Sequence, residues 1–393
     1  MMDRVPTTAC CLCKACLNIC PAGAIVFDRE EHTFLYPRIN QTKCVHCGGC
    51  EKVCPSLHPE RRKPGSPRRV YAAKNRNTQE RLRSSSGGIF IALAEKMIGN
   101  QGAVCGVVFQ EGFQARHIVT RDVYTVQKMQ GSKYVQSDLG LSFRQIEKLL
   151  AAGTPVLFCG CPCQVAGLKS YLGGDHPSLY LVDLICHGVL SQGLLDSYLQ
   201  YLENKYRANI TDFQFRSKAL GWHNSAVSVS FANGKRLLEP MTVNAYMKTY
   251  FAGITQKEAC FSCPYKGFQS GADITLGDLW GAETLLPQWD DNRGLSAVLI
   301  HSERGEKLFD ALQTIEAREF PLESVIQYNR NLLEPTHRGG DRQRFFAYAA
   351  KNGYEKCWKD LMQETPLEKC RRELTFLLRC AFYKIQGRKK PLY

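Results

Sequence analysis

The sequence lacks long hydrophobic runs, which restricts where the protein can work. Although 44% of its 393 residues are apolar, no run approaches the length of a membrane-spanning helix, about 18 uninterrupted apolar residues. The first residues, MMDRVPTTACCLC, also lack the apolar core of a signal peptide. We therefore expect a cytoplasmic protein with no transmembrane segment, long enough for about two to three domains.

Acidic residues are in deficit, 37 against 51 basic ones, and the net charge is +14. The whole excess lies in two places, because residues 61–83 carry +8 and the last 28 residues carry +6. Residues 84–365 hold 28 charges of each sign. A nucleic-acid groove would need positive charge on the folded body, so we expect no nucleic-acid partner. Residues 61–83 are either a solvated linker or a docking strip for an acidic ferredoxin or flavodoxin.

Cysteine, by contrast, is abundant: the chain has 19, and nine of them lie between residues 10 and 54. Without a secretion signal, this density indicates metal or redox chemistry rather than a disulfide scaffold. The spacing C-x2-C-x2-C-x3-C-P occurs twice, in Cys10, Cys13, Cys16 and Cys20 and again in Cys44, Cys47, Cys50 and Cys54.

This spacing is that of bacterial ferredoxins, in which three close cysteines bind one [4Fe–4S] cluster and the fourth binds the other. The alternative is a pair of zinc knuckles, which use separated CxxC pairs and not two complete four-cysteine runs. Cys11 lies outside the pattern and is interpreted as a neighbour. We assign one cluster to Cys10, Cys13, Cys16 and Cys54, and the second to Cys20, Cys44, Cys47 and Cys50.

From residue 70 onward, short apolar strands alternate with helical stretches, which favours a mixed α/β layer with some parallel strands. Asn233-Gly234 between two alternating runs predicts a hairpin. Beyond about residue 320 the pattern is mostly helical. We therefore predict an α+β ferredoxin-like dicluster domain followed by a mixed α/β flavin-binding domain and a helical C-terminal region. The boundaries are 1–60 for the dicluster domain, 61–69 for a basic linker, 70–335 for the α/β domain and 336–393 for the basic helical region.

Three glycine- or serine-rich turns in the α/β region predict a cofactor cradle. They are SSSGG (84–88), GSKYVQS (131–137) and CGCPCQ (159–164), and none matches G-x-G-x-x-G or the P-loop. Each turn alone is more typical of a structural turn. Together, at helix starts and strand ends, they fit an anion, a flavin or another nucleotide-like cofactor.

A second set of cysteines lies in the same region. Cys260 and Cys263 form a CxxC followed by proline, which alone is either a redox dithiol or half of a zinc site. With Cys186 and one cysteine of the 159–163 turn, it could hold one more cluster with dispersed ligands. The remaining cysteines fall in strand or helix patterns and are expected to be buried apolar residues: Cys105, Cys357, Cys370 and Cys380.

Four segments resemble motifs of the coenzyme F420 hydrogenase/dehydrogenase beta-subunit family. They are VLFCGCPCQVAGLKSYL, LYLVDLICHGVLS, FRSKALGW and ACFSCPYKGFQSGADITLGDLWG. The turns SSSGG and GSKYVQS resemble the flavin-binding loops of this family, and the fused dicluster domain is found in many bacterial members. The resemblance covers roughly residues 1–335 and implies an iron–sulfur flavoprotein.

The resemblance also implies site residues. Contacts to FAD would come from Ser85, Ser86, Gly87, Gly88, Ser132, Lys133 and Gln136. Ligands of an additional [4Fe–4S] cluster would be Cys163, Cys186, Cys260 and Cys263. Family members usually lack cysteines at the positions of Cys159 and Cys161, so it stays open which cysteine of this turn is a ligand.

The implied chemistry is hydride transfer at the flavin with a nearby proton donor. His187 is the candidate, because an imidazole titrates near neutral pH; the alternative is a core histidine bonded to a carbonyl. We predict a ferredoxin- or F420-linked oxidoreductase acting on a small-molecule substrate, with a ferredoxin or flavodoxin as electron carrier. A relay subunit of a larger redox complex is the second hypothesis, a cluster-bearing regulatory or nucleic-acid-binding protein the third. The relay hypothesis needs a partner subunit, whereas a free-standing enzyme would be a monomer or homo-oligomer.

The C-terminal tail predicts an amphipathic helix, with an apolar face on residues that include Leu367, Leu374 and Ile385. Such a helix either packs on its own domain or makes a peripheral membrane contact.

Overall fold

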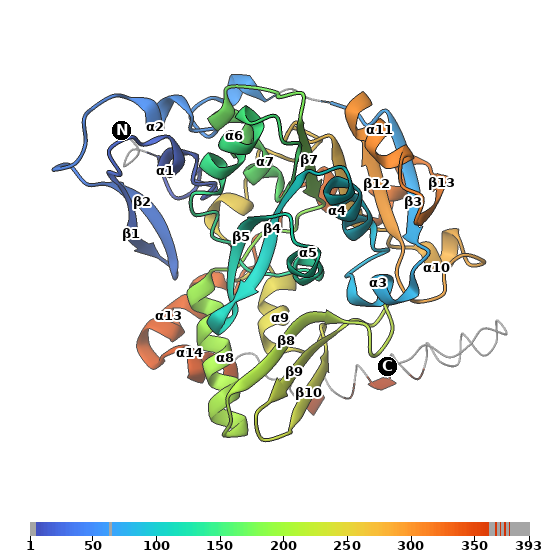
Figure 1. Cartoon of the computed structure of the whole chain (residues 1–393). Helices are drawn as coiled ribbons and strands as arrows, with labels where there is room; N and C mark the ends of the chain where they lie inside the picture. Colours follow the sequence, from blue (N-terminus) through green and yellow to red (C-terminus); the bar gives the residue numbers. More distant parts are fainter. Residues whose placement is uncertain are drawn as a thin grey trace. The chain divides into compact units, whose positions relative to one another are not determined.

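The computed structural model describes residues 5–62 and 65–360, together with residues 366, 367, 370, 373, 374 and 377. Much of the predicted tail helix, Ile385 included, lies outside these residues. The chain divides into two compact units, each considered by itself. The first joins Met1–Gly193 with Gln256–His337, and the second joins Leu194–Thr255 with Arg338–Tyr393. Their elements are labelled in Figure 1.

The N-terminal segment of the first unit contains a β-hairpin. β1 (Ile25–Glu31) pairs antiparallel with β2 (Phe34–Ile39), with an irregularity between Phe27 and Arg29. Phe34 and Tyr36 alternate with exposed residues and pack with the nearby cysteines in one apolar cluster. Three short helices complete the segment: α1 (Ala15–Ile19), α2 (Gly49–Lys52) and η2 (Pro59–Arg61).

An eight-stranded mixed sheet forms the body of the first unit, in the order β13-β3-β12-β11-β7-β6-β4-β5. The central strands β4, β6, β7 and β11 are parallel, and the outer pairings are antiparallel. The predicted mixed α/β layer is therefore confirmed. The strands are β3 (Arg69–Asn75), β4 (Ala103–Gln110), β5 (Gln114–Thr120), β6 (Val156–Gly160), β7 (Leu179–Leu184), β11 (Ile274–Asp278), β12 (Ser296–Ile300) and β13 (Ile315–Glu319).

Helices in the crossovers between strands bury an apolar face on the sheet, as expected for a mixed α/β layer. Alternate residues of β6 belong to different apolar clusters, since Phe158 packs with Phe143 of α6 while Cys159 packs with Leu93 of α4. The helices are α3 (Thr78–Arg83), α4 (Ile89–Gly99), η3 (Glu111–Phe113), α5 (Val123–Met129), α6 (Ser142–Ala151), α7 (Pro162–Leu172), η4 (Glu258–Cys260), α10 (Ala282–Leu285), α11 (Glu303–Asp310), α12 (Leu322–Tyr328) and η5 (Arg330–Leu332).

The second unit is built on a three-stranded antiparallel sheet, in the order β10-β9-β8. The predicted turn at Asn233-Gly234 joins two of its strands, and Gly234 takes a φ of 79° that favours glycine. Its core includes Tyr198, Tyr246 and Trp358 in mutual ring contact. Its elements are α8 (Gln192–Tyr206), which belongs to this unit from Leu194 onward, β8 (Ile210–Ser217), β9 (Ala226–Phe231), β10 (Arg236–Pro240), α9 (Ala245–Phe251), α13 (Arg342–Asn352) and α14 (Tyr354–Asp360). Across the described parts of both units, no helix is long and apolar enough to cross a bilayer.

Candidate functional site

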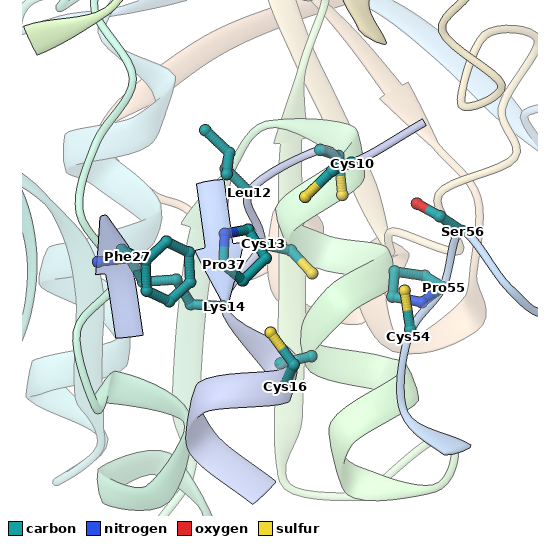
Figure 2. Close-up of a pocket in the computed structure, with 12 residues that line it drawn as sticks. Cys10, Leu12, Cys13, Lys14, Cys16, Phe27, Pro37, Cys54, Pro55 and Ser56 are labelled. Carbon is teal, nitrogen blue, oxygen red and sulfur yellow. The ribbon is translucent and has the colours of Figure 1, made fainter. Parts of the chain in front are cut away.

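Four cysteines of the N-terminal segment surround one cavity, here called the first cysteine group: Cys10, Cys13, Cys16 and Cys54. Figure 2 shows their thiols directed toward the same space. The loop turns tightly before α1, because Leu12 and Lys14 both adopt left-handed backbone conformations. Burial, together with the nearby thiols of Cys10 and Cys54, raises the pKa of Cys16. Converging buried thiols fit a [4Fe–4S] cluster, which is bound by thiolates.

The second cysteine group is Cys20, Cys44, Cys47 and Cys50. Its loop is also left-handed, at His46 and Gly48, and Cys47 is exposed. The Cys20 sulfur accepts a hydrogen bond from the Ala24 amide at 3.2 Å. The Cys50 thiol contributes to the raised pKa of Cys16, so the two groups are neighbours. Cys20, Cys44 and Cys50 pack against the apolar cluster that contains Cys10, Cys16 and Cys54, and the second group lies nearer to solvent.

Helix α7 lies directly against the first cysteine group. A Cβ at Gly167 would come within 2.5 Å of the Cys13 Cβ and 2.9 Å of its sulfur. Glycine is therefore required there for the close approach.

A third cysteine group lies where loops follow β6, β7 and η4. Cys163 is in the first turn of α7, Cys186 follows β7, and Cys260 ends η4 with Cys263 just beyond it. Burial is the main cause that raises the pKa of Cys260 to about 12 and that of Cys263 to about 11, and the nearby thiols of Cys186 and Cys163 add to the effect. The four residues that family resemblance implies as ligands are therefore close in space.

The two extra cysteines of the 159–163 turn differ in position. Cys159 packs in the apolar core beneath α4, and burial raises its pKa to about 12. Cys161 caps α7 and lies beside Cys186, and this neighbouring thiol lowers the pKa of Cys186. Cys159 thus lies within β6 and faces the apolar core, whereas Cys161 follows the strand as the N-cap of α7 and lies beside the third group.

Cys11 links the third group to the first. Cys11, Cys13 and Cys163 pack in one apolar cluster, and the thiols of Cys13 and Cys163 both act on the pKa of Cys11. The buried hydroxyl of Tyr265 has no hydrogen-bond partner, and the thiols of Cys11, Cys13 and Cys163 all act on its pKa. An orphaned donor beside converging thiols suits the inorganic sulfide acceptors of a bound cluster, so these residues fit a further [4Fe–4S] cluster.

A buried basic residue, Lys257, contacts both Cys11 and Gln136, and it was not identified from the sequence. Its side chain is almost fully buried, at 1% exposure. Its ammonium donates to the Cys11 carbonyl at 2.5 Å and to Gln136 Oε1 at 2.7 Å. Burial acts to lower its pKa, whereas the nearby Cys260, Cys163 and Cys11 act to raise it, and the pKa lies above its usual value.

The two turns predicted to cradle a flavin are in contact. Ser85 Oγ accepts hydrogen bonds from the Ser132 amide at 2.6 Å and the Ser132 hydroxyl at 2.9 Å. At the same junction, the buried Oε1 of Gln130 has no partner. An unmet acceptor between two half-buried, hydroxyl-rich turns fits a bound cofactor.

The other flavin candidates have contacts that serve the fold. Gly88, in the left-handed region, precedes α4, and Gly87 has no room for a Cβ, which would collide with the Ala73 carbonyl. Ser86 donates to the Leu295 carbonyl at 2.7 Å. Lys133 donates to four carbonyls at the end of α5, those of residues 128–131.

His187 follows Cys186 directly, so it lies beside the third cysteine group, and its carbonyl accepts a hydrogen bond from Thr336 at 2.8 Å. A second titratable group, missed by sequence reasoning, lines a pocket with Cys186 and Lys266. This is Asp183, at 3% exposure, whose pKa burial raises to about 7. Its carboxylate accepts hydrogen bonds from Ser270 at 2.6 Å and Thr275 at 2.5 Å.

The thiol groups can now be set beside known proteins. Residues 9–57 match the 4Fe-4S dicluster domain model, and residues 153–324 match the model for the C terminus of the coenzyme F420 hydrogenase/dehydrogenase beta subunit. A search of curated proteins gave no match. Among solved structures, a chain from the xenon-derivatized F420-reducing [NiFe] hydrogenase complex of Methanosarcina barkeri is 17% identical, with a TM-score of 0.47; the match covers 84% of this chain and 98% of that one.

At a coarse level these matches make the chain an iron–sulfur protein of an oxidoreductase family. Residues 153–324 thus resemble the C terminus of the coenzyme F420 hydrogenase/dehydrogenase beta subunit, and a segment that resembles a 4Fe-4S dicluster domain precedes them.

Proposed function

We propose that this protein is an iron–sulfur flavoprotein oxidoreductase that transfers electrons between a ferredoxin-type carrier and a small organic substrate or a deazaflavin. Bound clusters would supply one-electron chemistry, and FAD would couple it to two-electron transfer. The observation that carries the proposal is the contact of the third cysteine group with the first, through Cys163, Cys11 and Cys13. Thiols this close favour one continuous path across the chain.

In this proposal each cysteine group has one task. The exposed second group, with Cys47 at the surface, would face the electron carrier. The first group would be intermediate, and the third, held by Cys163, Cys186, Cys260 and Cys263, would be the innermost. The turns joined by Ser85 and Ser132 would hold FAD, with Gln136 between them and the third group. His187 stays the candidate proton donor.

Iron counting on the anaerobically purified chain tests the third cluster. Three clusters give about twelve irons per chain, and two give about eight. The double variant Cys260→Ser/Cys263→Ser should lose about four irons and keep the dicluster signals. The expectation that Cys370 is buried is wrong, because it is exposed, and it lies outside the three groups. Cys370→Ser is therefore the matched control and should keep all the irons. A wild-type count near eight would refute the third cluster, and absence of flavin absorbance would refute the FAD proposal.

The alternative is an electron-relay subunit whose catalytic site lies on a partner chain. The family description as a beta subunit favours it, and so does the exposure of Cys47, because a partner could dock there as readily as a soluble carrier. Size-exclusion chromatography of the native protein decides between the two. Substrate reduction by a stable monomer or homo-oligomer supports the free-standing enzyme, whereas copurification with another redox chain supports the relay subunit.

A further inference from the structure

The environment of Lys257 needs a physical explanation. A buried ammonium is costly unless opposite charge or full hydrogen bonding compensates it. The two hydrogen-bond acceptors of Lys257, the Cys11 carbonyl and the Gln136 amide oxygen, are both neutral. Cys260, Cys163 and Cys11 are among the groups that act on its pKa, so Lys257 lies beside two of the proposed cluster ligands. A bound cluster, which is negatively charged, would supply the compensating charge.

The backbone fixes Lys257 in this place. Its amide donates to the Val189 carbonyl at 2.9 Å, and its own carbonyl accepts from the Cys260 amide at 2.9 Å. The residue is thus tied both to the loop that follows Cys186 and to the start of the CxxC segment. From this anchored backbone the side chain reaches the Cys11 carbonyl and Gln136.

We propose that Lys257 is the built-in counter-charge of the third cysteine group and that it raises the reduction potential of the cluster bound there. The inference rests on the proposed third cluster. A [4Fe–4S] cluster with four thiolates carries about −2 when oxidised, and one more negative charge when reduced. A fixed positive charge in a buried, weakly screened place favours the more negative state.

The position of Lys257 gives this charge a function. The thiols of Cys163, Cys11 and Cys13 form the contact between the third and first groups, and Lys257 binds the Cys11 carbonyl in that contact. One electron would pass from the first-group cluster to the third-group cluster. The first would thereby be oxidised and the third reduced, with no bond formed and no proton moved. Lys257 would favour the electron on the inner side, next to Gln136 and the proposed flavin turns.

The test compares Lys257→Met with Lys257→Arg in the full-length, anaerobically purified protein. Redox titration followed by electron paramagnetic resonance gives the potential of each cluster. Methionine keeps the length but not the charge, so the third cluster should become at least tenfold harder to reduce, which is about 59 mV for one electron. Arginine keeps the charge and should stay within about threefold of wild type.

Lys74→Met is the matched control. Lys74 is also mostly buried, donates to a backbone carbonyl, that of Trp289, at 3.3 Å, and has no cysteine among the groups that act on its pKa. It should leave every cluster potential unchanged. An unshifted third cluster in Lys257→Met, or an equal shift in Lys257→Arg, would overturn the proposal. If the methionine variant does not load iron, the arginine variant alone decides the question. Arginine keeps the charge, so a lowered reduction potential of the third cluster in Lys257→Arg would overturn the proposal. A wild-type count of eight irons would instead defeat the third cluster itself.

Discussion

Gly167 makes a prediction at the scale of a single residue. Because a Cβ there would lie 2.5 Å from the Cys13 Cβ, Gly167→Ala should push the Cys13 loop away from α7. We expect loss of the first-group cluster, about four irons per chain, because one of its four ligands is displaced. Iron analysis and the resonance spectrum of the reduced protein measure this.

The control is Gly99→Ala at the end of α4, where an added Cβ meets nothing within 4 Å. It should keep full iron and gain a little helix stability. Full iron in Gly167→Ala would mean that the loop accommodates the methyl group.

His117 predicts a pH dependence of stability. The ring is buried against Phe158 at a centroid distance of 5.4 Å, and burial lowers its pKa to about 4. The unfolded chain, with a histidine pKa near 6.5, binds this proton more readily, so stability is complete above about pH 6.5 and falls as the pH drops toward 4. The loss is on the order of 1.4 kcal/mol per pH unit within that window.

His117→Phe keeps a flat ring beside Phe158 but cannot titrate. Chemical denaturation at pH 7.5 and 5.5 should show a smaller loss of unfolding free energy for the variant than for wild type. An equal loss in both proteins would show that other groups control acid stability.

At the scale of the element, the C-terminal end of α5 depends on Lys133. Its amine donates to the carbonyls of residues 128–131, at the end of the helix and just beyond it, where carbonyls lack intrahelical donors. Burial lowers the pKa of Lys133 to about 7, so this donor is only partly charged at neutral pH. Lys133→Met should lower the unfolding free energy by about 1–3 kcal/mol, since those carbonyls lose their donor. If the adjacent turn holds FAD, flavin content should fall as well.

Lys128→Met is the comparison within the same helix, because Lys128 is exposed. Thermal unfolding and flavin absorbance should both stay near wild type for it. Equal effects in the two variants would assign the change to helix charge and not to capping.

Elements also show what the sequence could and could not predict. Strands such as β6 and β12 are mostly apolar, so composition alone predicts them. The edge strand β13 buries only Ile315, and its sequence IEARE has no apolar pattern to detect. Spacing predicts ligands for the first two cysteine groups because three of the four cysteines in each lie in one short loop. Spacing gives no sign that Cys11 meets Cys163, a contact made only by the tertiary fold. Lys257 could not be predicted from the sequence for the same reason.

At the scale of the whole molecule, the net charge of +14 predicts an effect of salt on electron transfer. Two clusters with four thiolates each would lower it to about +10, which still attracts an acidic carrier. Raising the salt concentration from about 50 to 300 mM should slow reduction by an acidic ferredoxin by roughly tenfold, because screening shortens the range of attraction.

Reduced methyl viologen, a small cation, is the control donor, and its rate should not fall with salt. If the rate of reduction by ferredoxin did not depend on salt, the basic segments would have no part in recognising the carrier.

The third cysteine group also has a consequence for how the protein matures. Cys163 and Cys263 are 100 positions apart in the chain and meet only after β6, β7 and the returning segment before β11 are in place. The first two groups span residues 10–54 and are complete as soon as the N-terminus emerges during synthesis. Iron insertion should therefore be sequential, with the dicluster segment charged early and the inner position filled last. A cell short of iron would accumulate chains that accept electrons at their surface and cannot pass them inward.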